Sequence, residues 1–150
     1  MNRPAFEPTL KGRALRLLSQ REHSRLELER KLAAHEAEPG QLAKALDELQ
    51  ARGFISEERV VESVVHRRAA KLGTARVKQE LQAKGLTGEA VREALEQLRS
   101  TELDRAREVW RRKFGEPVTD PKEKARQIRF LVSRGFAAEV VRRVVQGTDD

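Results

Sequence analysis

Apolar residues recur along the chain at the spacing of buried helical faces, and the pattern is clearest in the middle of the sequence. A stripe at i, i+4 and i+7 is formed there by Val91, Leu95 and Leu98. Gly85 precedes this stripe at a position that suits the left-handed residue after a helix end, where a Cβ atom would be penalised. We therefore predict a helix that ends at Lys84, a glycine turn, and a second helix that begins at Thr87 as its N-cap.

The apolar register around Leu81 and Gly85 recurs on both sides of this stretch. Fifty residues towards the C-terminus it is kept by Leu131, Gly135, Val141 and Val145. Forty-nine residues towards the N-terminus, with Glu36 in place of the glycine, it is kept by Leu32, Leu42, Leu46 and Leu49. A period of roughly 40–50 residues is typical of stacked helical units, each of which needs its neighbours to cover its apolar side. Chance similarity between amphipathic helices is the alternative.

The other apolar stripes complete a set of nine predicted helices, with no convincing strand. We expect three units of three helices, at residues 10–55, 56–100 and 101–147. A loose arm at residues 1–9 precedes them, and an acidic tail at 148–150 follows. The predicted fold class is therefore all-α, with three tandem three-helix repeats.

Capping signals place several helix ends. Ser24 and Glu27 have the spacing of a capping box, Thr101 is expected to cap another helix, and Asp120 precedes a proline at a first helical position. The longest helix is expected at residues 56–72. Its inward stripe is predicted to consist of Val61, Val65, Ala69 and Leu72. The inward side of the helix after Asp120 is predicted to consist of Ala125, Ile128 and Val132.

Composition and charge sharpen this picture. The absence of Cys excludes disulfides and thiolate metal sites, and no apolar stretch approaches a leader peptide or a membrane span. We therefore expect a soluble, cytoplasmic protein that acts as a monomer. The 31 basic and 24 acidic residues give a net charge of +7, and the excess of basic residues lies mainly in residues 59–115. Residues 36–58 are acidic instead. A surface of mixed sign favours a partner that offers both a polyanion and a protein.

We find no pattern that supports catalysis or holds a cofactor. Gly-rich phosphate-binding motifs are absent, and His23, His35 and His66 lack metal-ligand spacing. The adjacent carboxylates of Glu57 and Glu58 are explained by their place in a first helical turn. No Ser lies in a nucleophile motif. We therefore expect neither an enzyme nor a protein that binds a metal or a cofactor.

Two clusters of basic residues are the candidate contacts for DNA or for an acidic protein surface. The first consists of Arg67, Arg68, Lys71, Arg76 and Lys78. The second consists of Arg105, Arg111, Arg112 and Lys113. A solvated face with local ion pairs, such as Glu108–Arg112, is the alternative. Trp110 lies between these basic residues but in register with its helix's apolar stripe, so we assign it to the core rather than to base stacking.

Sequence-specific reading of DNA by the central pair of helices is disfavoured. The turn at Gly85 resembles the glycine turn of helix-turn-helix motifs. However, the helix after it carries Glu89, Glu93 and Glu96. A helix with so many carboxylates would be repelled by the phosphates that flank the major groove.

Several stretches resemble motifs of the RecX family, in the family's order and over nearly the whole chain (11–146). They are residues 14–28, Gly53-Phe-Ile-Ser-Glu-Glu-Arg59, Trp110-Arg-Arg-Lys-Phe-Gly115 and Arg129-Phe-Leu-Val-Ser-Arg-Gly-Phe136. The chain departs from the family at Val60-Val61-Glu62-Ser63, where an aromatic-containing segment is frequent, and it has no Tyr.

The resemblance implies three tandem three-helix repeats in an extended, curved arrangement, and the role of a regulator. RecX-like proteins bind the filament that a RecA-type recombinase forms on single-stranded DNA. They suppress its ATP hydrolysis and strand exchange, and so modulate homologous recombination and the SOS response. We expect the elongated body to lie in the filament groove and to span neighbouring protomers. The alternatives are a general nucleic-acid-binding protein that competes for DNA and a helical scaffold for another protein.

Overall fold

The computed structural model describes residues 8–147, and these fold into nine α-helices and one short 3₁₀ helix, without a strand. The helices are α1 (Leu10–Gln20), α2 (Arg25–Leu32), η1 (Ala33–His35), α3 (Gln41–Ala51), α4 (Glu57–Arg68), α5 (Thr74–Ala83), α6 (Glu89–Ser100), α7 (Glu102–Lys113), α8 (Pro121–Ser133) and α9 (Ala138–Gln146). The predicted all-α class is confirmed. The predicted acidic tail, and all but the last two residues of the predicted arm, lie outside the described residues.

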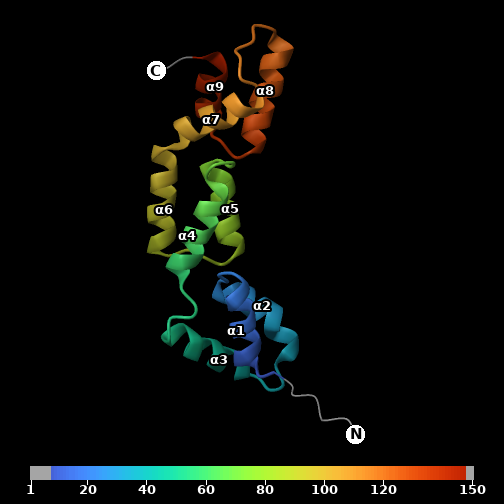
Figure 1. Cartoon of the computed structure of the whole chain (residues 1–150), viewed down its shortest axis with the longest axis vertical. Coiled ribbons are helices and arrows are strands. Elements are labelled where there is room, and N and C mark those ends of the chain that lie inside the picture. The colour runs from blue at the N-terminus through green and yellow to red at the C-terminus, as the bar shows by residue number, and fades with distance from the viewer. Residues whose placement is uncertain (1–7, 148–150) are drawn as a thin grey trace.

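Three helical units follow one another along an elongated, curved body, with the α1–α3 unit (blue to teal) at one end and the α7–α9 unit (gold to red) at the other (Figure 1). Each unit closes around its own apolar cluster. In the first unit the cluster is built on Leu28, Leu32, Leu46 and Leu49. In the second it is built on Val64, Val77, Leu81 and Leu95. In the third it is built on Ala106, Leu131, Phe136 and Val141.

The separate clusters differ from one expectation drawn from the repeat pattern, that each unit needs its neighbours to cover its apolar side. The three helices of a unit pack on one another instead, as the pairs α1·α3, α4·α6 and α7·α9 show. The apolar stripe of each helix is therefore buried inside its own unit, where each fully buried Leu or Val stabilises it by roughly 1.5–3 kcal/mol. Polar groups supply much of the contact between units, together with Leu26 of α2, which lies against Gly85 of the second unit.

Local signals in the sequence place several helix ends correctly. Ser24 and Glu27 form the predicted capping box, with the Glu27 N–H donating to Ser24 Oγ (3.2 Å) and the Ser24 N–H donating to Glu27 Oε1 (3.0 Å). The Asp120 carboxylate accepts from the Lys122 N–H, with Pro121 in the first turn. Gly85 adopts the predicted left-handed conformation, with φ +76°. These signals work because their hydrogen bonds join neighbouring residues.

Two predicted helix boundaries are wrong, and at a third, correctly placed helix start the predicted capping bond is missing. Helix α4 ends at Arg68 rather than at residue 72, so that α8, with 13 residues, is longer than α4. Helix α6 begins at Glu89, and its N-cap is Gly88 rather than Thr87. Thr101 holds the N-cap position of α7, but its hydroxyl donates to carbonyl oxygens of α6 and caps no N–H. In each case a contact from another part of the chain, or a neighbouring glycine, decides the end.

The buried faces of two helices are rotated from the predicted stripes. In α4 the buried residues are Val60, Val61 and Val64, because the helix packs on both α5 and α6. Its predicted inward residues Val65 and Ala69 are only partly buried. In α8 the buried residues are Gln127 and Leu131, while the predicted inward residue Val132 is 45% exposed.

Candidate functional site

The first basic cluster is partly neutralised inside the second repeat. Arg67 and Arg68 of α4 converge on Glu80 of α5, with Arg67 Nη2 3.5 Å from Oε2 and Arg68 Nε 2.9 Å from Oε1. Lys71 and Lys78 are exposed, and neither forms an ion pair within residues 8–147. The cluster therefore keeps a positive surface, but two of its cations are oriented by one carboxylate.

The structure divides the second basic cluster between two sides of α7. Arg111 and Arg112 both bind Glu108, at 2.6 Å (Nη2–Oε1) and 2.9 Å (Nε–Oε1), and these hydrogen bonds lower the pKa of Glu108 to about 2. The local Glu108–Arg112 ion pair considered from the sequence is thus present. Lys113 turns towards α8 instead, where its Nζ lies 5.0 Å from the centre of the Phe130 ring.

Arg105 has a structural role, and we leave it out of the proposed contact surface. Its side chain is only 14% exposed. Its guanidinium donates to the carbonyl oxygens of Ala69 (3.0 Å), Leu72 (2.6 Å) and Leu98 (2.8 Å). These bonds satisfy carbonyls at the ends of α4 and α6, which accounts for the early end of α4. The sequence could not show this, because Arg105 looks like any other basic residue of α7.

A strip of alternating cations and aromatic rings lies along α8. The Phe130 ring is approached by Lys113 at 5.0 Å and by Arg134 at 4.9 Å. Phe114 meets Phe130 edge to face at 5.5 Å, and the Arg126 guanidinium lies 5.5 Å from the Phe114 ring. Such distances fit cation–π attraction, which orders the cations while leaving them available to an anion.

The strip continues onto the second repeat. Arg76 of α5 donates to the Ser133 carbonyl oxygen (2.7 Å), which places its guanidinium beside the C-terminal end of α8. We call this surface the Phe130 strip and define it as Arg76, Lys113, Phe114, Arg126, Phe130 and Arg134. It joins one member of each predicted basic cluster, Arg76 and Lys113, across the boundary between repeats.

Arg126, Phe130 and Arg134 were not predicted as site residues, although the sequence contains a signal for them. These three residues follow one another at intervals of four, which places a cation, a ring and a cation on one face of a helix. Arg126 also pairs with Glu123 of the same helix (Nη2–Oε1, 2.5 Å). Phosphate groups are the ligands that this strip suits best, because the cations can bind phosphates while the rings hold the cations in place.

Trp110 is partly buried and lies against the third repeat's core, on the apolar side of its helix as predicted. It packs on the apolar cluster, and its Nε1–H donates to Oε1 of the buried Gln127 (2.9 Å). Within residues 8–147, no group of three His, Cys, Asp or Glu side chains could hold a metal ion. No helix among these residues is long and apolar enough to cross a membrane.

Comparison with known proteins identifies all three units. Models of the first, second and third three-helix domains of RecX match residues 11–49, 56–95 and 100–145. The regulatory protein RecX of Leptothrix cholodnii is 57% identical over 148 residues, covering 99% of this chain and 93% of the relative. That of Ralstonia nicotianae is 49% identical, covering 94% and 89%.

Solved structures agree with the fold. The crystal structure of RecX from Lactobacillus salivarius has a TM-score of 0.70 at 20% identity and covers 93% of this chain and 94% of that one. A crystal structure of a regulatory protein RecX has a TM-score of 0.72 at 19% identity, with coverage of 91% and 71%. With three domain models matched in order, and relatives similar over almost the full length, the chain belongs to the RecX family.

Proposed function

We propose that this chain binds the filament of a RecA-type recombinase on single-stranded DNA and inhibits its ATPase and strand-exchange activities. It would thereby modulate homologous recombination and the SOS response, as a cytoplasmic monomer without catalysis of its own. Its relatives are named regulatory proteins, which supports the regulatory part. The observation that carries the proposal is the basic, aromatic strip on an elongated array of three independently closed units.

An elongated array suits a filament because several weak contacts act together. Once one repeat is bound, its neighbours are held close to the next protomers, so that modest contacts combine into a tight one. The Phe130 strip would meet DNA phosphates or an acidic protein surface. Further contacts with the filament would come from the remaining basic residues predicted from the sequence, Arg67, Arg68, Lys71, Lys78, Arg111 and Arg112.

Inhibition of the recombinase ATPase by a strip variant tests the proposal. We expect the Lys113→Ala/Arg126→Ala/Arg134→Ala variant to need about tenfold more protein for half-inhibition, because three contacts worth at least a few tenths of a kcal/mol each are lost. A matched control removes three exposed cations elsewhere, as Lys44→Ala/Arg52→Ala/Arg92→Ala. The control should stay within about twofold of the unmodified chain. Equal inhibition by both variants, with unchanged helicity, would count against the strip.

The Phe130 strip also favours a second function, direct binding of single-stranded nucleic acid with indirect competition for DNA. The two functions differ in their response to added DNA. A protein that only competes for DNA stops inhibiting when excess bare single-stranded DNA is supplied, because the recombinase and its competitor can then each bind a separate strand. A filament-binding regulator keeps most of its inhibition under the same conditions.

A further inference from the structure

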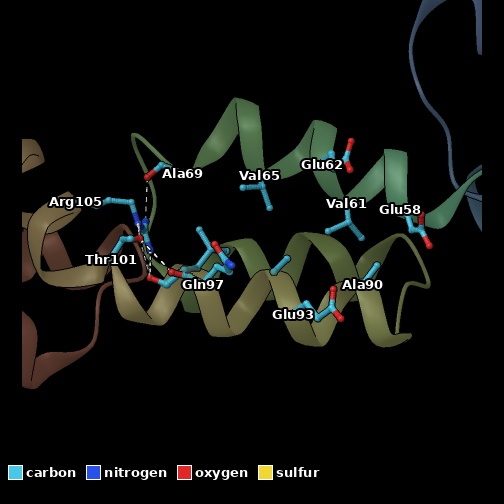
Figure 2. Close-up of a pocket in the computed structure, with 12 residues that line it drawn as sticks. Glu58, Val61, Glu62, Val65, Ala69, Ala90, Glu93, Gln97, Thr101 and Arg105 are labelled. Carbon is cyan, nitrogen blue, oxygen red and sulfur yellow. Dashed lines mark hydrogen bonds between the residues drawn. The ribbon is translucent and has the colours of Figure 1, made fainter.

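The first and third helices of the middle repeat leave an open groove of about 610 Å³ between them. Its floor is apolar and built mainly from small side chains. In Figure 2, Val61 and Val65 project from α4 into the space above α6, where Ala90 lies opposite. Ala94 also lines the floor. Small residues on a floor allow another helix to approach closely, and the groove has the size of sites that take two or three side chains.

Three carboxylates stand at the rim of this groove: Glu58 and Glu62 on α4, and Glu93 on α6. All three are exposed, and none forms an ion pair within the described part of the chain. Glu58 lies in the first turn of α4, where the helix dipole favours an acidic residue. Glu62 and Glu93 lie beyond the first turn of their helices, so the dipole does not explain them.

The opposite end of the groove is closed by Arg105. Figure 2 shows its guanidinium beside Ala69 and Thr101, far from Glu58 and Glu93. Because this guanidinium is already bound by three carbonyl oxygens, it offers little to a ligand. The charge that an incoming segment would meet is therefore negative, in a chain whose net charge is +7.

The equivalent hollows of the other two repeats have a different character. Between α1 and α3, the space is lined by the Lys11–Glu48 ion pair and by Lys44. Between α7 and α9, it is lined by Arg107, Arg111 and Trp110. Among these three hollows, the one in the middle repeat combines an apolar floor with unpaired carboxylates. This combination favours a ligand that has both apolar and positively charged groups.

We propose that the α4–α6 groove docks a helical segment of a protein partner, one whose apolar stripe is flanked by Lys or Arg. Laying an amphipathic helix into a groove between two helices is a common mode of peptide recognition. The three carboxylates would pair with the flanking cations and would repel a nucleic acid. The groove is separate from the Phe130 strip, and the proposal does not depend on the recombinase as the partner.

The test uses three fluorescent peptides of about 18 residues, long enough to form a helix on binding. The first has a Leu/Ala stripe with flanking Lys. The second has Glu in place of each Lys, and the third has the first peptide's composition with the stripe scrambled. We expect the full chain to bind the first peptide at least about tenfold more tightly than the other two. Equal binding of all three would overturn the proposal.

A variant of the chain locates the binding. Glu58→Gln/Glu62→Gln/Glu93→Gln keeps side-chain size while removing the charges, and we expect about tenfold weaker binding of the Lys peptide. The matched control Glu38→Gln/Glu116→Gln/Glu139→Gln removes three exposed carboxylates outside α4 and α6 and should bind as the unmodified chain does. Equal loss in both variants would show only a general charge effect and would overturn the site.

Amide chemical shifts on adding the Lys peptide give an independent readout. We expect the changes to be confined to α4 and α6, around Val65 and Ala94. Changes centred on the hollows of the first or third repeat would overturn the assignment. So would sedimentation showing that the chain forms a dimer at micromolar concentration and that the Lys peptide dissociates this dimer.

Discussion

The two boundaries between repeats are built differently. The boundary between the second and third repeats contains a buried carboxylate bonded to backbone N–H groups and two backbones in close contact, whereas the boundary between the first and second is made by side chains: two ion pairs, and Leu26 packed against Gly85. Both follow the same plan, with loops at the end of one repeat meeting the next. The difference indicates that repeats two and three form one stiff unit, to which the first repeat is attached more loosely.

Glu102 is the centre of the boundary between repeats two and three. Its side chain is buried, and its two oxygens accept from the N–H groups of Thr74 (2.7 Å) and Ala137 (3.1 Å). One carboxylate therefore caps the starts of α5 and α9, which belong to different repeats. Beside it, the Gly73 N–H donates to the Arg134 carbonyl oxygen at 2.8 Å.

The boundary between repeats one and two uses longer side chains. Lys84 pairs with Glu27 (3.2 Å), and Arg59 pairs with Glu22 (2.9 Å). Arg30 donates to the Ala83 carbonyl oxygen at 3.3 Å. The Arg59–Glu22 pair is partly in water and contributes little, while the Lys84–Glu27 pair is largely buried. Long side chains that join the two repeats still permit more movement than two backbones in contact. We therefore expect the first repeat to be attached less rigidly than the third, while the Phe130 strip, at the other boundary, is held in place.

The largest effect is expected from Glu102→Ala. This substitution leaves the N–H groups at two helix N-termini without their acceptor and leaves Arg105 without its nearest carboxylate. We therefore expect the free energy of unfolding to fall by roughly 3–5 kcal/mol. Asp104→Ala, a substitution of an exposed residue in the same helix, should lower the free energy of unfolding by less than about 0.5 kcal/mol. Urea unfolding followed by circular dichroism measures both. Equal small losses would mean that the boundary is not held by Glu102.

Gly73→Ala should have the next largest effect. An added Cβ would lie 2.2 Å from the Gly135 carbonyl oxygen, a contact that only a backbone shift relieves. We expect a loss of about 1–3 kcal/mol, as for other overpacked sites. The control is Gly88→Ala, also an N-cap glycine, whose added Cβ would meet only the flexible end of Glu57. Similar stability of the two variants would contradict the close contact.

A smaller effect is expected where repeats one and two meet. Burial would raise the pKa of Glu27, but hydrogen bonds from Arg21, the Ser24 N–H and Lys84 lower it to about 2. In a double-mutant cycle, Glu27→Gln and Lys84→Ala should show a coupling of about 0.5–1 kcal/mol. A coupling above roughly 3 kcal/mol would make this boundary as strong as the other one and remove the contrast.

The smallest effect concerns pH and should be confined to the first repeat. Burial lowers the pKa of His23 below its usual 6.5, and the nearby charges of Arg21 and Lys31 lower it further, against the Arg21 carbonyl and Glu27. The unfolded chain therefore takes up the proton first, so stability is full above about pH 6.5 and falls as the pH drops below it. His23→Asn should flatten this dependence between pH 7.5 and 5.5. The exposed control His66→Asn should keep it.

The sequence allowed the fold to be predicted but only part of the candidate site. Ser24, Gly85 and Asp120 were assigned correctly because their partners are close in the chain. Glu102 could not be recognised, since the N–H groups that it binds are 28 and 35 residues away and its place in a first helical turn looks ordinary. The role of Arg105 could not be predicted for the same reason, since two of the carbonyl oxygens that it binds are 36 and 33 residues away in the sequence.

The Phe130 strip could be predicted only in part, because some of its contacts are local in sequence and others are long-range. The four-residue spacing within α8 was visible in the sequence, but the approach of Lys113 and Arg76 depends on how α7 and α5 pack against α8. The α4–α6 groove was hidden because Val65 and Ala69 were assigned to the core. A stripe of apolar residues shows that a helix face is apolar, and not whether its own neighbours cover it.

The affinity of the unmodified chain for recombinase-coated single-stranded DNA, measured against the same strand bare and at the same salt concentration, tests the central claim most directly. An array that recognises the filament should bind the coated strand at least about tenfold more tightly. Equal or tighter binding to the bare strand would contradict the proposed function, and so would the absence of binding to either.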